Sequence, residues 1–137
     1  PYFKDHADLH FNLSHSGNFA VCIVAGMPCG IDIEGNRPFK SSVAKRFFSK
    51  TEYHWIYDTE NVSVQAERFF RLWTLKEAYA KATGNGIAAE IHAASYVPDT
   101  DSDGLCLADS ETGKHFQIKE AEYDGLRIAA VLSDSAF

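Results

Sequence analysis

Acidic residues at two places in the chain are the first candidates for chemistry. The segment Gly30-Ile31-Asp32-Ile33-Glu34 alternates apolar and acidic residues, as a strand does when one of its faces is buried. Ile31 and Ile33 would anchor such a strand in the core, and Asp32 and Glu34 would stand side by side on the other face. Two neighbouring carboxylates repel each other unless a cation lies between them, and Mg²⁺ prefers oxygen ligands of this kind. The alternative is an edge strand whose acidic face is solvated.

The third acid is Glu77, which lies between Trp73 and Lys81 at a spacing of four residues on either side. On a helix these three residues share one face. By themselves Glu77 and Lys81 would be an exposed helix ion pair worth only about 0.3 kcal/mol. Trp73 indicates instead that this face turns toward the protein, where Glu77 would need a cation and Lys81 an anion such as phosphate.

A third candidate element is the segment Phe11 to Gly17, which reads Phe-Asn-Leu-Ser-His-Ser-Gly. Phe11 and Leu13 alternate with polar residues, which predicts a half-buried strand. Ser14, His15, Ser16 and the backbone of the glycine that follows could offer hydrogen bonds to a phosphate at the strand end. A Ser-His-acid hydrolase is the rival interpretation, but adjacent Ser and His residues on a strand point to opposite faces, and the G-x-S-x-G motif is absent.

Turn and capping signals predict the elements that position these residues. Ser49 and Glu52 form a capping-box pattern at the start of one helix, and Gly84 follows the last residue of a longer one. The predicted strands are residues 10–16, 19–25, 30–34, 93–97, 105–108, 115–121 and 127–132, and the predicted helices are residues 50–57 and 62–83. This order indicates one α+β domain over residues 1–137, with a helical insert in the middle and a β-rich end.

The longer helix carries an apolar stripe formed by Phe69, Leu72 and Trp73. We expect this stripe to dock the helix against the strands that carry Leu13 and Ile33.

Composition narrows the class of protein. The 137 residues are 45% hydrophobic and 23% charged, which is typical of one globular domain. The net charge of −6 disfavours nucleic-acid binding and attachment to an anionic membrane, and no apolar run approaches the length of a membrane span. No signal peptide is visible, and three cysteines without C-x-x-C spacing favour the reducing cytoplasm.

Four segments, taken together and in this order, resemble the 4′-phosphopantetheinyl transferases of the type that activates surfactin synthetase. The family pattern is an F-N-x-S-H-S-G strand, then G-I-D-I-E, then F-F-x-x-x-E, and then W-x-x-K-E-A-x-x-K-x-x-G-x-G. Here the four motifs are residues 11–17, 30–34, 47–52 and 73–86. The resemblance implies a transferase-like lobe in which an antiparallel sheet packs against a long helix with a short helical insert.

The activity that the resemblance implies is transfer of the 4′-phosphopantetheine arm of coenzyme A to a serine of an apo acyl or peptidyl carrier protein. Mg²⁺ would be the cofactor, and its ligands would correspond to Asp32, Glu34 and Glu77. These residues would also hold the coenzyme A pyrophosphate.

The remaining site residues implied by the resemblance act on phosphate and on the attacking serine. The phosphate contacts would correspond to His15, Lys76 and Lys81, with Ser14 beside them. Glu52 or Glu77 would be the base for the serine, directly or through a water, and Lys81 would offset charge on the leaving bisphosphate. The alternatives are a catalytically silent lobe that binds carrier proteins, and a Mg²⁺-dependent nucleotide hydrolase built on the same carboxylates.

The chain also departs from the family pattern. Enzymes of this type have two pseudo-symmetric halves with coenzyme A between them, and the motifs found here belong to the C-terminal half. We therefore expect either a fragment of a two-lobed enzyme, which lacks its N-terminal lobe, or a single lobe that forms a homo-oligomer, as the trimeric holo-acyl-carrier-protein synthases do.

A basic stretch within this acidic chain is the predicted docking surface for the carrier protein. Residues 36–50 contain five bases and no acid, whereas residues 99–111 contain five acids and no base. Carrier proteins resemble small acidic helical bundles, which favours the basic stretch as their contact. The alternative is an ordinary solvated helix surface.

Overall fold

The computed structural model describes residues 2–35, 37–84, 94–99, 101–110 and 116–133. Its elements, in chain order, are β1 (His10–Ser16), β2 (Phe19–Ala25), β3 (Cys29–Gly35), α1 (Ser41–Phe47), α2 (Lys50–Tyr57), α3 (Val62–Thr83), β4 (Ala94–Pro98), β5 (Leu105–Ser110), β6 (Phe116–Tyr123) and β7 (Leu126–Ser133). The predicted strands and helices are all present within a few residues. Ala93 and His115, the first residues of two predicted strands, lie outside the described residues, as do Asn85 and Gly86.

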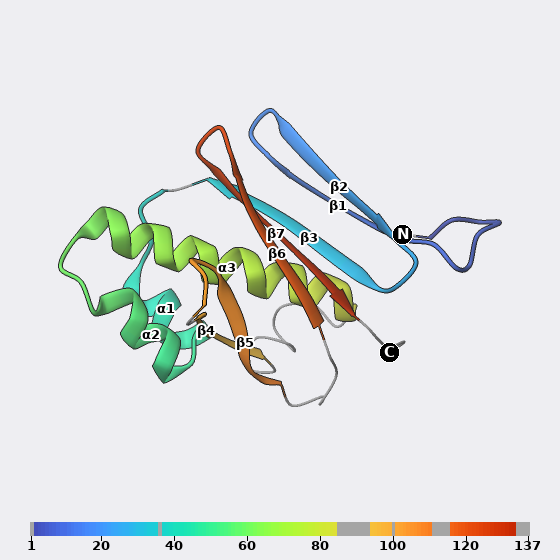
Figure 1. Cartoon of the computed structure of the whole chain (residues 1–137). Helices are drawn as coiled ribbons and strands as arrows, with labels where there is room; N and C mark the ends of the chain where they lie inside the picture. Colours follow the sequence, from blue (N-terminus) through green and yellow to red (C-terminus); the bar gives the residue numbers. More distant parts are fainter. Residues whose placement is uncertain (1, 36, 85–93, 100, 111–115, 134–137) are drawn as a thin grey trace.

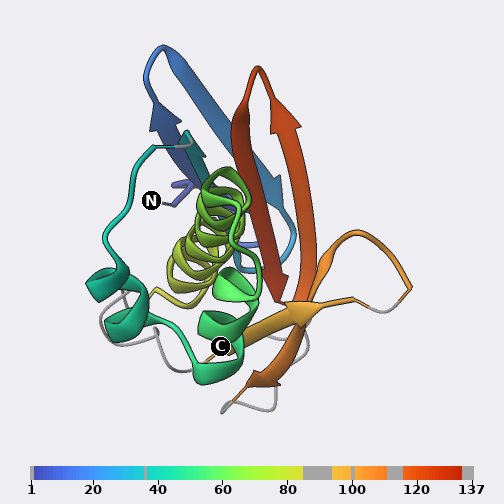
Figure 2. The same ribbon diagram turned by 90° about the vertical axis from the view of Figure 1, so that its left-hand side faces the viewer.

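The strands form three antiparallel sheets, with the orders β1-β2, β3-β7-β6 and β4-β5. In the central sheet Asp32 of β3 lies opposite Ala129 of β7. Helix α3 runs along this sheet, and the short helices α1 and α2 lie near its N-terminal half (Figure 1). Figure 2 looks nearly along α3 and shows it between the short helices on one side and strands β6 and β7 on the other.

The expected α+β class, with antiparallel sheets and a long helix, is confirmed.

Both ends of α3 are capped by side-chain and backbone hydrogen bonds. The Asn61 Oδ1 atom accepts from the backbone N–H of Ser63 at 3.0 Å and of Val64 at 3.3 Å. At the other end Gly84 has a φ of 77°, a left-handed conformation that glycine adopts without strain, and its N–H donates to the Ala80 carbonyl. These caps explain why the helix has the bounds predicted from the sequence.

Trp73 does not pack where the apolar stripe predicted. Its ring is only partly buried and stacks on Phe69, with centroids 6.0 Å apart. It also meets the edges of Phe47 and Phe48, at 5.6 and 6.5 Å. The prediction that Trp73 faces the strands is therefore wrong: this side of α3 is covered by the end of α1. Leu72 is fully buried, as predicted.

The faces of β1 are inverted relative to the prediction. Leu13 is 57% exposed and points away from the protein, whereas its polar neighbours point inward. Asn12 Oδ1 accepts from the N–H of Ile31 at 3.0 Å, and Ser14 Oγ accepts from the N–H of Ile33 at 3.3 Å. Because β7 lies on the other edge of β3, the N–H groups on this edge need acceptors, and β1 supplies them from side chains.

Gly30 allows β3 and α3 to approach each other closely. A Cβ atom at this position would lie 1.9 Å from the Ala78 carbonyl oxygen and 2.6 Å from the Ala82 nitrogen. Only a glycine on the strand permits this distance, because the atoms that a Cβ would meet belong to the helix backbone. The same contact brings the next turn of α3 up to the acidic segment of β3.

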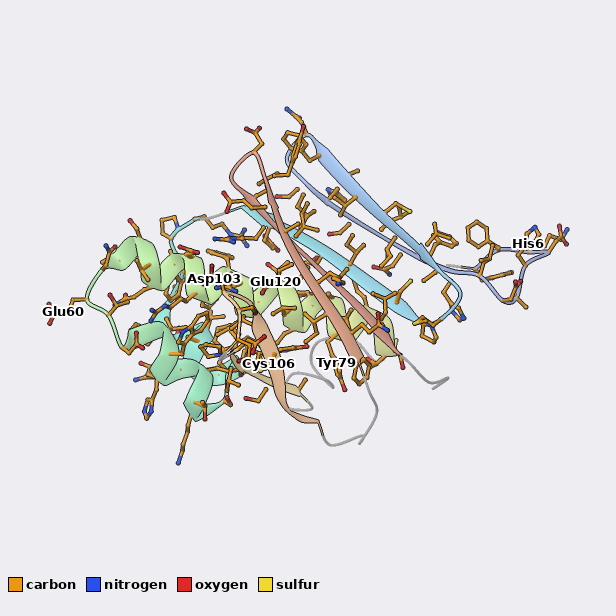
Figure 3. The ribbon with its side chains drawn as sticks, in the orientation of Figure 1. His6, Glu60, Tyr79, Asp103, Cys106 and Glu120 are labelled. Atoms are coloured by element: carbon orange, nitrogen blue, oxygen red, sulfur yellow. The ribbon has the colours of Figure 1, made fainter. Side chains whose placement is uncertain are left out.

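A bidentate ion pair joins α3 to the C-terminal strands. Arg71 donates to both carboxylate oxygens of Glu120 on β6 at 3.0 Å, and to the Asp103 carbonyl at 2.9 Å. Figure 3 labels Asp103 and Glu120, which lie next to each other in this view, over the middle of α3. None of the helices among the described residues is long and apolar enough to cross a membrane.

Candidate functional site

Asp32 is the buried centre of the site. Only 6% of the residue is exposed, because β3 is covered by α3 on one face and by the β1–β2 hairpin along its edge. Its Oδ1 atom accepts from Ser14 Oγ at 3.0 Å and from Lys81 Nζ at 2.9 Å. Its Oδ2 atom is buried without a hydrogen-bond partner in the structure. A carboxylate oxygen left in this way can accept a further donor or a cation.

Helix α3 brings Glu77 and Lys81 to the same place, one turn apart. Lys81 reaches the strand directly, because its Nζ also donates to the Ile31 carbonyl at 2.9 Å. Glu77 is partly buried, and the negative charges of Asp32 and Glu34 on β3 act on it. The structure thus places Lys81 in contact with Asp32, and the charges of Asp32, Glu34 and Lys81 all act on Glu77.

The protonation equilibria of the site reflect this crowding. Burial raises the pKa of Asp32; the hydrogen bond and charge of Lys81 and the hydrogen bond from Ser14 oppose the shift, and the Glu34 charge adds to it. Burial also raises the pKa of Glu77, as do the charges of Asp32 and Glu34, while Lys81 lowers it. Mutual repulsion of carboxylates is the electrostatic signature of a place suited to added positive charge.

Basic side chains neutralise part of this charge. Lys81 pairs with Asp32, and Arg37 pairs with Glu34 at 2.7 Å. In the part of the chain that the structure describes, no group of three or more His, Cys, Asp or Glu side chains is arranged to hold a metal ion as it stands. The chemistry of the donors nevertheless suits Mg²⁺: the charges of Asp32 and Glu34 act on Glu77, and a buried carboxylate oxygen of Asp32 has no hydrogen-bond partner.

Glu52 and Lys76 form a second, separate polar cluster. Lys76 Nζ lies 3.0 Å from Glu52 Oε1, and the two side chains are 3% and 0% exposed. Lys76 also donates to the Ala94 carbonyl at 2.8 Å, and burial lowers its pKa, against the effect of the Glu52 charge. The structure therefore does not place these two candidate site residues beside Asp32.

The Glu52 carboxylate is also tied to the backbone on both sides. Its Oε1 accepts from the N–H of Ser49 at 2.8 Å, which completes the predicted capping box, and its Oε2 accepts from the N–H of Tyr96 at 3.1 Å. The Ser49 and Ser95 hydroxyls share a hydrogen bond of 2.8 Å. These contacts join the helical insert to β4 through a buried charge.

Ser14 and His15 lie on opposite faces of β1. Ser14 points toward β3 and holds Asp32, whereas His15 is exposed on the outer face with Leu13. Asn12 and Arg37 were missed by the sequence reasoning. The (i, i+3) spacing of Glu34 and Arg37 could have indicated their pairing, whereas the inward direction of Asn12 has no local signal.

A hollow of about 170 Å³ lies next to Arg37, between the segment before α1 and the N-terminal half of α3. It is lined by Arg37, Pro38, Phe39, Lys40, Val43, Phe69, Phe70 and Trp73. The Arg37 guanidinium lies 4.8 Å from the centre of the Phe70 ring, so one residue borders both this hollow and Glu34.

Comparisons with known proteins show which chains this one is similar to. The chain is 42% identical over 88 residues to 4′-phosphopantetheinyl transferase Sfp of Bacillus subtilis, which covers 64% of this chain and 39% of that protein. It is 51% identical over 83 residues to 4′-phosphopantetheinyl transferase HetI of Nostoc, covering 58% of this chain and 35% of the relative. The chain thus spans less than half the length of these relatives.

Solved structures share the fold. A holo-(acyl-carrier-protein) synthase from Bacillus anthracis in complex with CoA (3′,5′-ADP) superposes with a TM-score of 0.63 at 22% identity, over 80% of this chain and 97% of that one. The Helicobacter pylori holo-[acyl-carrier-protein] synthase in complex with coenzyme A gives 0.61 at 21% identity, over 77% and 99%. A family model for the 4′-phosphopantetheinyl transferase superfamily matches residues 28–131, which include every candidate site residue except Ser14 and His15. The chain therefore belongs to the 4′-phosphopantetheinyl transferase superfamily.

Proposed function

We propose that this chain is the C-terminal lobe of a 4′-phosphopantetheinyl transferase, which moves the phosphopantetheine arm of coenzyme A to a serine of an apo carrier protein. The observation that supports the proposal is the ion pair of Lys81 with buried Asp32, beside the acids Glu34 and Glu77 whose charges act on the same site, within the residues that the family model matches. Relatives with this name support the transfer, and they also support a second lobe, since the chain spans only 39% of the Bacillus subtilis protein.

In the proposed reaction the serine oxygen bonds to the phosphorus that carries pantetheine. The bond from that phosphorus to the bridging oxygen breaks, adenosine 3′,5′-bisphosphate leaves, and the serine proton passes to a base. Such a transfer requires positioning and charge stabilisation more than covalent chemistry by the protein. Asp32, Glu34 and Glu77 would hold Mg²⁺, which when bound supplies positive charge to the pyrophosphate oxygens.

Of the two candidate bases, position favours Glu77. Its raised pKa brings it nearer to the range in which a carboxylate accepts a proton effectively, and it is only partly buried. Glu52 is 0% exposed, and both its oxygens are engaged with Lys76 and the backbone, so an incoming serine has no path to it in this conformation. We propose that Glu52 and Lys76 position α3 and β4 instead.

Lys81 would stabilise charge on the phosphates, since it is 29% exposed and carries its ammonium beside Asp32. We retain His15 as a phosphate contact, because its exposed ring can meet a ligand that extends beyond the edge of β3. Ser14 would act through Asp32, to which its hydroxyl donates.

The carrier protein would dock on the basic surface formed by Lys40, Lys45, Arg46 and Lys50, all of which are exposed. Such a surface on a chain of net charge −6 suits an acidic partner. We place the reaction in the cytoplasm, because Cys22, Cys29 and Cys106 are free thiols.

The test is to incubate the chain with coenzyme A, Mg²⁺ and an apo carrier protein, and to measure the mass of the carrier. We expect the carrier to gain one phosphopantetheine group, and we expect Asp32→Asn to abolish the gain while Asp101→Asn, at an exposed position, retains it. Coenzyme A binding without any gain would indicate a silent lobe. Release of the bisphosphate without a carrier would indicate a hydrolase.

A further inference from the structure

The Lys81 ammonium supplies positive charge to the Asp32 carboxylate from within the chain. Its stem rises from α3, and its ammonium donates to Asp32 Oδ1 and to the Ile31 carbonyl, both at 2.9 Å. The Asp32 side chain is 8% exposed and that of Lys81 is 29% exposed, so the carboxylate is fixed in the core while the lysine reaches it from the rim. The flexible four-carbon stem of a lysine allows a partly exposed ammonium to turn away from such a carboxylate.

From this geometry we propose that Lys81 is an internal counter-ion that competes with the divalent cation for Asp32. Binding of the metal would then displace its ammonium toward the phosphates of the substrate. The inference rests on the proposed function, because it concerns the same carboxylates and the same metal.

The Lys81 ammonium and a divalent metal ion bound at Asp32 would repel each other. Asp32 Oδ1 already accepts from Ser14 and Lys81, so a metal would bind at Oδ2 and at the carboxylate of Glu77. A doubly charged ion held there would lie within a few ångströms of the Lys81 ammonium, in surroundings partly screened from water. The repulsion would weaken metal binding until the ammonium moved away.

A displaced ammonium would remain near the acids of the site. Glu77 lies one helical turn before Lys81, so a lysine that leaves Asp32 remains beside the acids that would hold the metal and its bound pyrophosphate. The lysine would therefore be released where negative charge arrives with the substrate. In the absence of metal, the same side chain would limit the repulsion among the three acids.

The experiment measures Mn²⁺ binding to the chain by calorimetry and electron paramagnetic resonance, without coenzyme A. Lys81→Met removes the charge and keeps most of the stem, and we expect it to bind Mn²⁺ at least about tenfold more tightly than the wild type, since removal of a nearby like charge favours the ion. Lys81→Arg keeps the charge and should bind as weakly as the wild type. Lys119→Met is the matched control for net charge at an exposed position and should leave the affinity unchanged.

A second readout is thermal. Because a ligand that binds only the folded state stabilises it, added Mg²⁺ should raise the Tm of Lys81→Met more than that of the wild type. This comparison uses each variant as its own reference, so a lower starting Tm of the variant does not affect it.

The outcomes separate the inference from the proposed function. One result would overturn the inference and leave the metal site in place. In that case Asp32→Asn abolishes Mn²⁺ binding, but Lys81→Met binds Mn²⁺ no more tightly than the wild type does. Absence of Mn²⁺ binding in both the wild type and Lys81→Met would overturn the inference together with the proposed metal site. Tighter binding by Lys81→Met, with Lys81→Arg and Lys119→Met unchanged, is the result that supports it.

Discussion

Replacement of Gly30 by alanine should separate the strand that carries the acids from the helix that faces it. The added Cβ would lie 1.9 Å from the Ala78 carbonyl oxygen, whereas ordinary contact begins at 3.4 Å, so the two backbones must move apart by about 1.5 Å. Overpacking of a core costs about 1–3 kcal/mol, and here both partners are backbone atoms that cannot turn aside. We therefore expect Gly30→Ala to lower the free energy of unfolding by about 3 kcal/mol.

The assay is urea unfolding followed by circular dichroism, with Gly26→Ala as the matched control. A Cβ at Gly26 meets nothing closer than the Asp8 carbonyl at 4.0 Å, so that variant should stay within about 0.5 kcal/mol of the wild type. In thermal unfolding, 3 kcal/mol corresponds to a Tm lower by about 10 °C for a chain of this size. A loss below about 1 kcal/mol in Gly30→Ala would show that the strand and helix tolerate the added methyl, and would refute the close-approach argument.

Other substitutions test the remaining contacts. Trp73→Ala should lower the unfolding free energy by about 2–3 kcal/mol in urea, since the ring is only partly buried; a loss below about 1 kcal/mol would contradict its packing role. Glu52→Gln removes the carboxylate charge that pairs with Lys76 at 3.0 Å and should cost about 3 kcal/mol, part of which should return when Lys76 is also replaced by methionine. Because burial raises the pKa of Asp32 above its unfolded value, ionisation costs stability as the pH rises through the folded pKa. Asp32→Asn should therefore have a higher Tm than the wild type at about pH 7, and this advantage should shrink toward about pH 4; an advantage that grows in acid would contradict the burial argument. Reversal of Lys45 and Arg46 to Glu should raise the KM for the carrier protein and not that for coenzyme A, and equal effects on both would contradict docking at that surface.

Local signals in the sequence predicted most of the helices and strands. For α3 this was possible because the residues that cap its two ends are visible in the sequence. The side chain of Asn61 and the left-handed Gly84 are short-range features, and they determine where α3 begins and ends regardless of the rest of the fold. The spacing of Glu77 and Lys81 predicted that they share one face of that helix, whereas the ion pair between Lys81 and Asp32 was not predicted.

The directions of side chains that depend on distant partners could not be predicted from the sequence. An alternating strand has an inward and an outward face, and the usual assignment of the apolar face to the interior was wrong for Leu13, because the edge of β3 needs polar acceptors. Lys76 and Glu77 are adjacent in sequence, but one enters a buried pair with Glu52 and the other faces the acids. Only the path of α2 and β4 around α3 determines that division.

Side chains of β1, and not its backbone, bind to β3. The contact between β1 and β3 can therefore change independently of the backbone pairing between β1 and β2. In a backbone ladder the hydrogen bonds come from the main chain, which most side-chain substitutions leave unchanged. Here Asn12 and Ser14 make the bonds, and each could be changed without altering the hydrogen bonds between β1 and β2. Because the Ser14 hydroxyl also holds Asp32, a change in the strength of this joint is transmitted to the acid itself. Selection acting on one hydroxyl could thus tune the site while both neighbouring sheets keep their pairing.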